Sequence, residues 1–182
     1  MGSVVRMAVC FAICVSGSIV LGQNVTEYEV KAIYLYNFSR FIQWPEGAAS
    51  GDDTFGICVL GQDPFGQTLN AALDDKAIQG KNVKIRRIVS LQESTGCRVL
   101  FISASEQKRL KQILVQLDGM SVLTVSDMPK FREQGGMMQF VWRGDRVRFE
   151  INLPRARRAG LILSAELLKV AANAKGLKLS GD

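Results

Sequence analysis

The sequence contains no histidine among its 182 residues. This absence excludes Ser-His-Asp and Cys-His catalysis and any zinc site with a histidine ligand. The chain has no Cys-x-x-Cys pair, which argues against a thiol-disulfide oxidoreductase. The glycines of residues 61–66 lack the Gly-Lys-Ser/Thr ending that holds phosphate and magnesium. Because the carboxylates form no recognisable acid-base constellation either, we expect no enzymatic activity, no metal and no cofactor.

Long hydrophobic runs are also scarce. The one near the start covers residues 7–21, follows a single cation and ends in small residues, a pattern typical of a secretory signal peptide. A bilayer-spanning helix needs about 20 apolar residues, so we place a signal peptide at residues 1–22 and keep an uncleaved anchor as the alternative. We expect residues 23–182 to form a single domain outside the cytoplasm.

The formal net charge is +6, and the sequence pI is about 9.3. An exported protein does not ordinarily meet nucleic acid, so we expect no nucleic-acid partner. The basic excess favours a membrane surface or an acidic protein partner, or it serves solubility alone.

Apolar segments with the period of a strand alternate with segments of helical period. The predicted strands are residues 54–60, 83–89, 98–102 and 121–125, and the predicted helices between them are residues 64–73 and 106–117. Residues 138–143 and 146–153 flank a Gly-Asp turn and predict an antiparallel hairpin. The order predicts an α/β fold, a three-layer α/β/α sandwich with a mostly parallel mixed sheet and an antiparallel C-terminal hairpin.

Residues 24–44 predict a long helix with a wide apolar surface that is rich in aromatic side chains. Tyr34, Phe38, Phe41 and Trp44 belong to this surface. Core packing is one interpretation, and an interface with a partner or a second copy is the other.

Residues 146–170 predict a strand, then Pro154 at the first position of a helix that continues to residue 170. Arginines in the first turn face the positive end of the helix dipole, so a nearby anion would stabilise them. That anion is either an acid of this chain, such as Glu150 or Asp145, or a small ligand, or an acidic group of a partner. The candidate ligand- or partner-binding residues are Arg148, Asn152, Arg155, Arg157 and Arg158.

Removal of the signal peptide would leave two cysteines, Cys58 and Cys97. In an oxidising compartment two cysteines favour a single disulfide, and the predicted strands that carry them can be neighbours. Closing a loop of about 38 residues should contribute roughly 3–4 kcal/mol. The bond is either structural or redox-sensing.

Two segments resemble the opening and closing motifs of the YfiR-like family. The first is EYEVKAIYLYNF at residues 27–38 with FIQWP at residues 41–45, and the second is FEINL at residues 149–153 with ARRAGL at residues 156–161. The order of elements between them fits too, so the resemblance covers essentially the whole chain after residue 22.

The resemblance implies a periplasmic repressor that binds the periplasmic sensor domain of an inner-membrane diguanylate cyclase and so controls cyclic-di-GMP and biofilm formation. It also implies an OmpA-like outer-membrane lipoprotein that sequesters the repressor, and a homodimer. The spacing of Cys58 and Cys97 resembles that of a family disulfide, while a second pair found in some relatives is missing. The alternative function is a periplasmic sensor of a small anion such as a nucleotide, phosphate or carboxylate.

Overall fold

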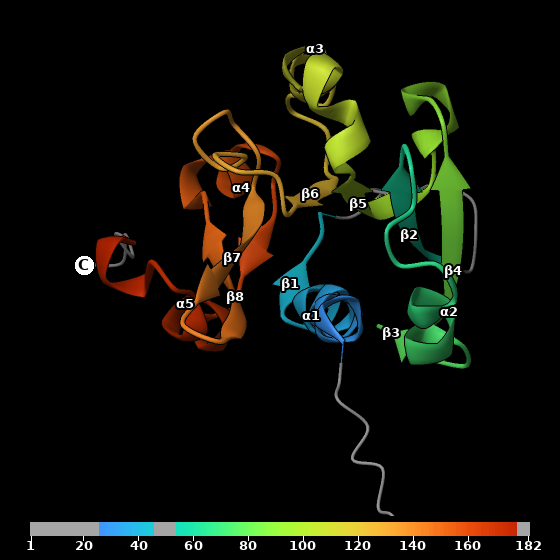
Figure 1. Ribbon diagram of the computed structural model, residues 1–182, viewed down its shortest axis with the longest axis horizontal. Helices are drawn as coiled ribbons and strands as arrows, with labels where there is room; N and C mark the ends of the chain where they lie inside the picture. The colour runs from blue at the N-terminus through green and yellow to red at the C-terminus, as the bar shows by residue number, and fades with distance from the viewer. Residues whose placement is uncertain (1–25, 46–53, 178–182) are drawn as a thin grey trace, which may run out of the picture.

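The computed structural model describes residues 26–45 and 54–177, and its central feature is a seven-stranded sheet (Figure 1). In spatial order the strands are β3 (Ala77–Ile78), β4 (Lys81–Ile88), β2 (Thr54–Leu60), β5 (Cys97–Ile102), β6 (Leu123–Ser126), β7 (Met138–Arg143) and β8 (Arg146–Ile151). The strands from β4 to β7 run parallel, and β3 and β8 are antiparallel to their neighbours. This topology confirms the predicted sheet and its C-terminal hairpin. The predicted signal peptide lies outside the described residues.

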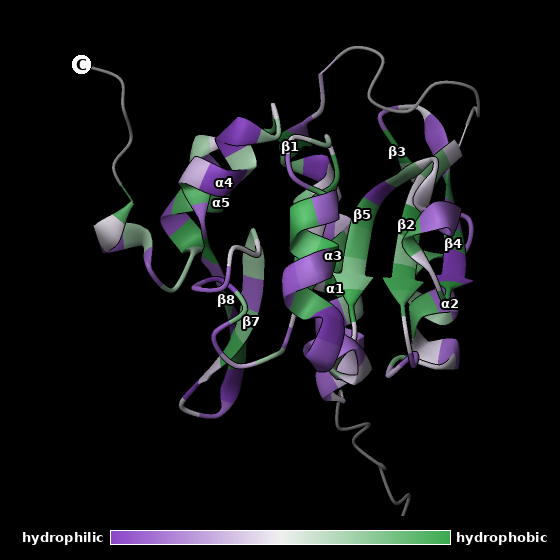
Figure 2. Ribbon diagram, turned by 90° about the horizontal axis from the view of Figure 1, so that it is seen from above, coloured by the Kyte–Doolittle hydropathy of each residue, from purple (hydrophilic) through white to green (hydrophobic). Residues whose placement is uncertain are grey.

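Helices cover both faces of the sheet, as the sandwich prediction requires (Figure 1). The helical segments are α1 (Glu27–Arg40), α2 (Gln67–Leu73), α3 (Leu110–Gln116), α4 (Leu153–Arg158) and α5 (Ala165–Val170), with 3-10 turns η1 (Leu91–Ser94), η2 (Ala104–Arg109) and η3 (Ala174–Gly176). Alternate β2 residues enter opposite cores: Ile57 packs with α1, α2 and α5, and Leu60 packs with α3. Figure 2 shows apolar residues gathered on β2 and β5 between these layers. Within the described ranges, no helix is long and apolar enough to cross a bilayer.

Cys58 and Cys97 form a disulfide between the adjacent strands β2 and β5, which confirms the predicted pair. Their Cα atoms are 5.8 Å apart, and both side chains are buried. The Arg86 guanidinium on β4 donates to Cys97 Sγ at 3.0 Å and lies 3.6 Å from Cys58 Sγ. The bond therefore links strands in the middle of the sheet.

The first helix is shorter than the predicted span of residues 24–44. It begins after Thr26, whose hydroxyl accepts from the Glu29 backbone N–H while the Glu29 carboxylate accepts from Thr26 N–H. The helix ends at Arg40, and β1 (Ile42–Gln43) then pairs antiparallel with β9 (Ile162–Leu163). This pairing joins distant parts of the chain, so the local apolar pattern did not reveal it.

The prediction of one continuous helix over residues 154–170 is wrong: α4 and α5 are separate, with β9 between them. Gly160 interrupts the helix because it adopts a φ of +74°, which glycine tolerates without steric cost. Ser164 then starts α5, its hydroxyl accepting from Leu167 N–H at 3.2 Å. Pro154 does lie in the first turn of α4, as predicted.

Candidate functional site

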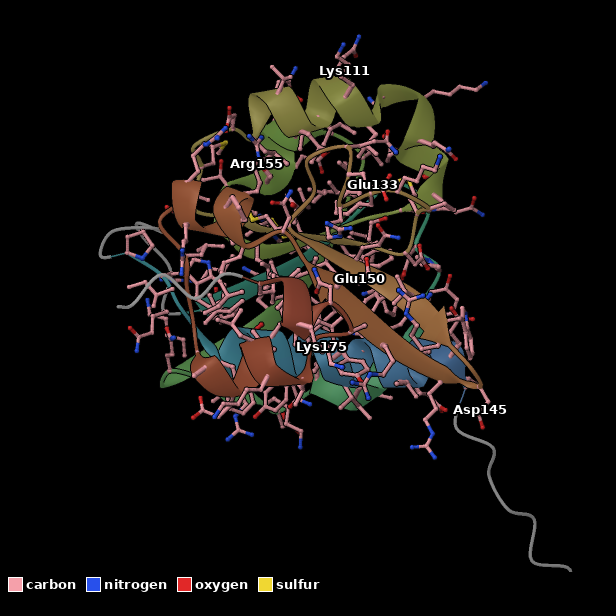
Figure 3. All side chains as sticks on the ribbon, turned by 90° about the vertical axis from the view of Figure 1, so that its left-hand side faces the viewer. Lys111, Glu133, Asp145, Glu150, Arg155 and Lys175 are labelled. Carbon is pink, nitrogen blue, oxygen red and sulfur yellow. A yellow bond between two sulfur atoms is a disulfide. The ribbon has the colours of Figure 1, made fainter. Side chains whose placement is uncertain are left out.

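Arg155 is the best-anchored of the predicted binding residues. Its Nη1 lies 2.7 Å from Asp118 Oδ1, and its Nη2 donates to the Leu114 carbonyl at 2.9 Å. The side chain is 17% exposed, so the ion pair ties α4 to the end of α3. Figure 3 shows Arg155 beside α3, far from Asp145 at the tip of the hairpin. The acid that neutralises Arg155 is therefore neither of the two suggested by the sequence.

Asn152 and Arg148 make hydrogen bonds that stabilise the fold. The Asn152 side-chain oxygen accepts from Arg155 N–H at 3.3 Å, and its amide donates to the Arg132 carbonyl at 3.1 Å. Arg148 Nη2 donates to the Val170 carbonyl at 2.9 Å, which joins β8 to the end of α5. These contacts explain both polar residues without a ligand.

Arg157 and Arg158 are exposed on α4. Because this helix has only six residues, they lie in its last turn, where the helix dipole favours cations. The dipole argument for an anion therefore does not apply to these two arginines, and the small-anion alternative stays a prediction. Binding of a partner by these arginines stays a prediction.

The four aromatic residues of the predicted interface divide into core and surface. Phe38 is fully buried, with its ring 4.7 Å from that of Phe149, and Trp44 is half-buried against Phe55 at 5.2 Å. Tyr34 is half-buried, and Phe41 is 41% exposed. The helix therefore has a core side and an aromatic edge that reaches the surface.

That edge borders a hollow of about 190 Å³ between α1, β8 and α5, here called the apolar groove. Its lining is Tyr34, Asn37 and Phe38 of α1, Phe41 directly after α1, Phe149 of β8, and Glu166, Leu167 and Val170 of α5. Val170 is 53% exposed. Two of the predicted interface residues, Tyr34 and Phe41, thus bring α1 to an accessible apolar surface.

A second hollow, here called the acidic hollow, has a volume of about 100 Å³ and was missed in the sequence. It lies where β6 ends and the hairpin turns, and its lining includes Glu27, Lys31, Asp127, Phe140, Trp142 and Val147. Lys31 is only 3% exposed; its Nζ pairs with Glu27 and lies 2.6 Å from Asp127 Oδ2. The four-residue spacing of Glu27 and Lys31 is that of two neighbours on one helix face. It could not indicate burial, because Asp127 is 96 residues from Lys31.

Tyr28 completes this ion cluster. Its hydroxyl donates to Asp127 Oδ2 at 3.0 Å, and the Lys31 ammonium lies 4.4 Å from the centre of its ring. Burial, followed by the negative charge of Asp127, raises the pKa of Tyr28 to about 12. The Asp127 carboxylate thus accepts from Tyr28 and Lys31, which lie in the first two turns of α1.

The fold and these surfaces define an α/β domain with two hollows beside its first helix. A YfiR/HmsC-like family model matches residues 28–172, and the chain belongs to this family. The family consists of periplasmic, non-catalytic regulators of diguanylate cyclase. The match confirms the resemblance found in the two terminal motifs, and it includes β8, α5 and all of α1 after its first residue.

Proposed function

We propose that the protein binds the periplasmic sensor domain of an inner-membrane diguanylate cyclase and holds the cyclase inactive, which limits cyclic-di-GMP and biofilm formation. Membership of a family of cyclase regulators supports the target. The Cys58–Cys97 disulfide supports an oxidising compartment such as the periplasm. Repression requires only that the protein bind the inactive state of the sensor more tightly than the active state.

The apolar groove is the proposed docking site, and its exposed apolar rim carries the proposal. Phe41 and Val170 stand 41% and 53% exposed on either side of a hollow backed by the buried ring of Phe149. A partner side chain that fills this hollow removes Phe41 and Val170 from water, and apolar burial contributes about 25 cal/mol per Å². Interface energy concentrates in such aromatic-lined pockets. An apolar side chain of the sensor domain is therefore the anchor that the groove accepts.

A second protein that covers the same groove would release the cyclase, because one surface cannot hold two partners at once. We assign this role to an OmpA-like outer-membrane lipoprotein. A homodimer that uses the groove would likewise exclude the sensor domain, so dimer and repressor complex would be alternative states linked by mass action.

Two matched valine variants test the docking site. Val170 in the groove and Val115 on α3, across the sheet, are both exposed, at 53% and 67%. Val170→Glu places a charge against the apolar anchor and should weaken binding to the purified sensor domain about 30-fold, since a central contact contributes about 2 kcal/mol. Val115→Glu should leave binding unchanged. Isothermal titration calorimetry measures both, and unfolding midpoints show that the variants are folded.

Gene deletion and complementation in cells test the repressor function and the docking site separately. Deleting the gene should raise cyclic-di-GMP and surface attachment; a deletion that changes neither, with the cyclase present, contradicts the repressor role. Complementation with Val170→Glu should fail to restore repression, and complementation with Val115→Glu should succeed. Full repression by a folded Val170→Glu protein would remove the groove from the interface while leaving the function standing.

A further inference from the structure

The acidic hollow shares no lining residue with the apolar groove. We propose that it binds a guanidinium or primary ammonium group, carried either by a small free cation or by an arginine or lysine of a partner protein. The proposal stands on the charges, the free acceptor atoms and the aromatic wall of the hollow. It does not rest on cyclase repression.

The charges of the hollow do not balance. Glu27 and Asp127 contribute two carboxylates, and Lys31 contributes the one cation of the lining. Both carboxylates contact the same ammonium, so the ionised cluster keeps one net negative charge. The lysine is 3% exposed, whereas the Glu27 and Asp127 side chains are 35% and 17% exposed. The excess negative charge therefore lies on the accessible side of the cluster.

Each carboxylate also keeps one oxygen for a ligand. Lys31 pairs with Glu27 Oε1, and Lys31 and Tyr28 both donate to Asp127 Oδ2. Within residues 26–45 and 54–177, no hydrogen bond reaches Glu27 Oε2 or Asp127 Oδ1. Because guanidinium and ammonium groups carry several N–H donors and no acceptor, they match a pair of free carboxylate oxygens.

Aromatic rings form the other wall. Phe140 is buried, while Trp142 on β7 is 54% exposed and lines the hollow beside the carboxylates. The face of a tryptophan attracts a cation within about 6 Å more strongly than any other aromatic ring. An exposed indole next to two carboxylates thus attracts a cation, as the carboxylates do. An anion would meet repulsion from both.

The size of the hollow and the number of its carboxylates also restrict the kind of ligand. The volume of about 100 Å³ is enough for a few water molecules and has the scale of a single charged head group. A calcium ion takes six to eight oxygen ligands, and the described part of the chain contains no cluster of three or more residues able to hold a metal. An organic cation fits the hollow better than a metal ion does.

Tyr34 connects the hollow to the apolar groove. Its ring lies 5.9 Å from that of Phe140 in the hollow and 5.4 Å from that of Phe149 in the groove. Lys31 and Phe38, one from each lining, are seven residues apart on α1, or about 10 Å along the helix axis. A partner that occupies both places would present a basic residue about this far from its apolar anchor.

The chain has two tryptophans, so the indole N–H signals in an NMR spectrum report the site directly. Trp44→Phe assigns the two signals. N-Ethylguanidinium and ethylammonium, titrated to roughly ten millimolar, should shift the Trp142 signal and leave the Trp44 signal in place. Neutral N-ethylurea has nearly the same shape as the guanidinium and should shift neither.

Glu27→Gln removes the net negative charge and should weaken guanidinium binding at least about tenfold. Glu133→Gln, an exposed glutamate outside the lining, is the matched control and should bind as the wild type does. No Trp142 shift with either cation, an equal shift with N-ethylurea, or unchanged affinity in Glu27→Gln would each overturn the proposal.

Competition identifies the source of the cation. Excess N-ethylguanidinium should weaken binding of the sensor domain if a partner side chain fills the hollow. If it binds without affecting the sensor domain, the natural ligand is a small free cation. If the sensor domain does not bind at all, repression is contradicted, while the Trp142 titration still decides the cation site.

Discussion

Reducing the Cys58–Cys97 disulfide should lower the free energy of unfolding by about 4 kcal/mol. The bond joins residues that are 39 apart in sequence. For a loop of this length the chain-entropy relation gives about 13 cal/mol/K, which is about 4 kcal/mol at 25 °C. A domain of this size changes its unfolding temperature by about 2–4 °C per kcal/mol, so the midpoint should fall by roughly 8–16 °C.

Urea unfolding with and without reductant measures this difference, and mass spectrometry verifies that both thiols are free. The slope of unfolding free energy against urea should rise on reduction, because the unfolded chain without the crosslink exposes more surface. A double variant, Cys58→Ala with Cys97→Ala, should not respond to reductant. A change below about 1 kcal/mol in fully reduced protein refutes the chain-entropy reasoning. Reduced protein that stays folded but no longer represses the cyclase would make the bond redox-sensing.

Two further predictions concern the ion pairs. Arg155→Ala should lower the free energy of unfolding in urea by about 1–3 kcal/mol, because it removes charged hydrogen bonds at a mostly buried site. Arg158 is exposed, so Arg158→Ala should change this free energy by less than about 0.5 kcal/mol. Equal losses in the two variants would contradict the anchoring role of Arg155. Folding raises the pKa of Tyr28 from 10.0 to about 12. The contribution of Tyr28 to stability is therefore fully present below pH 10 and is lost as the pH rises to about 12. Between these pH values the midpoint of urea unfolding should fall more steeply in the wild type than in Tyr28→Phe.

The sheet could be predicted because its signals are local. Strand β2 has the predicted bounds, since an apolar run ends at Gly61, where the chain turns with a φ of +88°. The β7–β8 hairpin follows from alternation on both sides of a Gly-Asp turn. The helices at the two ends of the domain were predicted too long. Gly160 stood inside a helical pattern that is equally compatible with two short helices, and the β1–β9 pairing that fixes their ends is long-range.

The candidate sites show the same difference between local signals, which the sequence reveals, and long-range contacts, which it does not. The aromatic residues of α1 could be found from their spacing, but only packing against Phe149 decides that Phe38 is core and that Phe41 reaches the surface. Lys31 sits four residues after Glu27, where sequence reasoning expects a solvated pair. Its burial requires Asp127, which the order of strands in the sheet brings to the start of α1.

The position of both hollows beside α1 bears on how one partner could be selected. The helix has 14 residues and is therefore about 21 Å long. A standard interface buries roughly 800 Å² on each partner, an area roughly 30 Å across, so a protein seated in the apolar groove also covers the acidic hollow. The chain has a net charge of +6 and attracts acidic surfaces in general. A hollow that requires one cation at a fixed distance from an apolar anchor would discriminate among those surfaces, because a partner without that cation would cover the free carboxylate oxygens of Glu27 and Asp127 without donating to them.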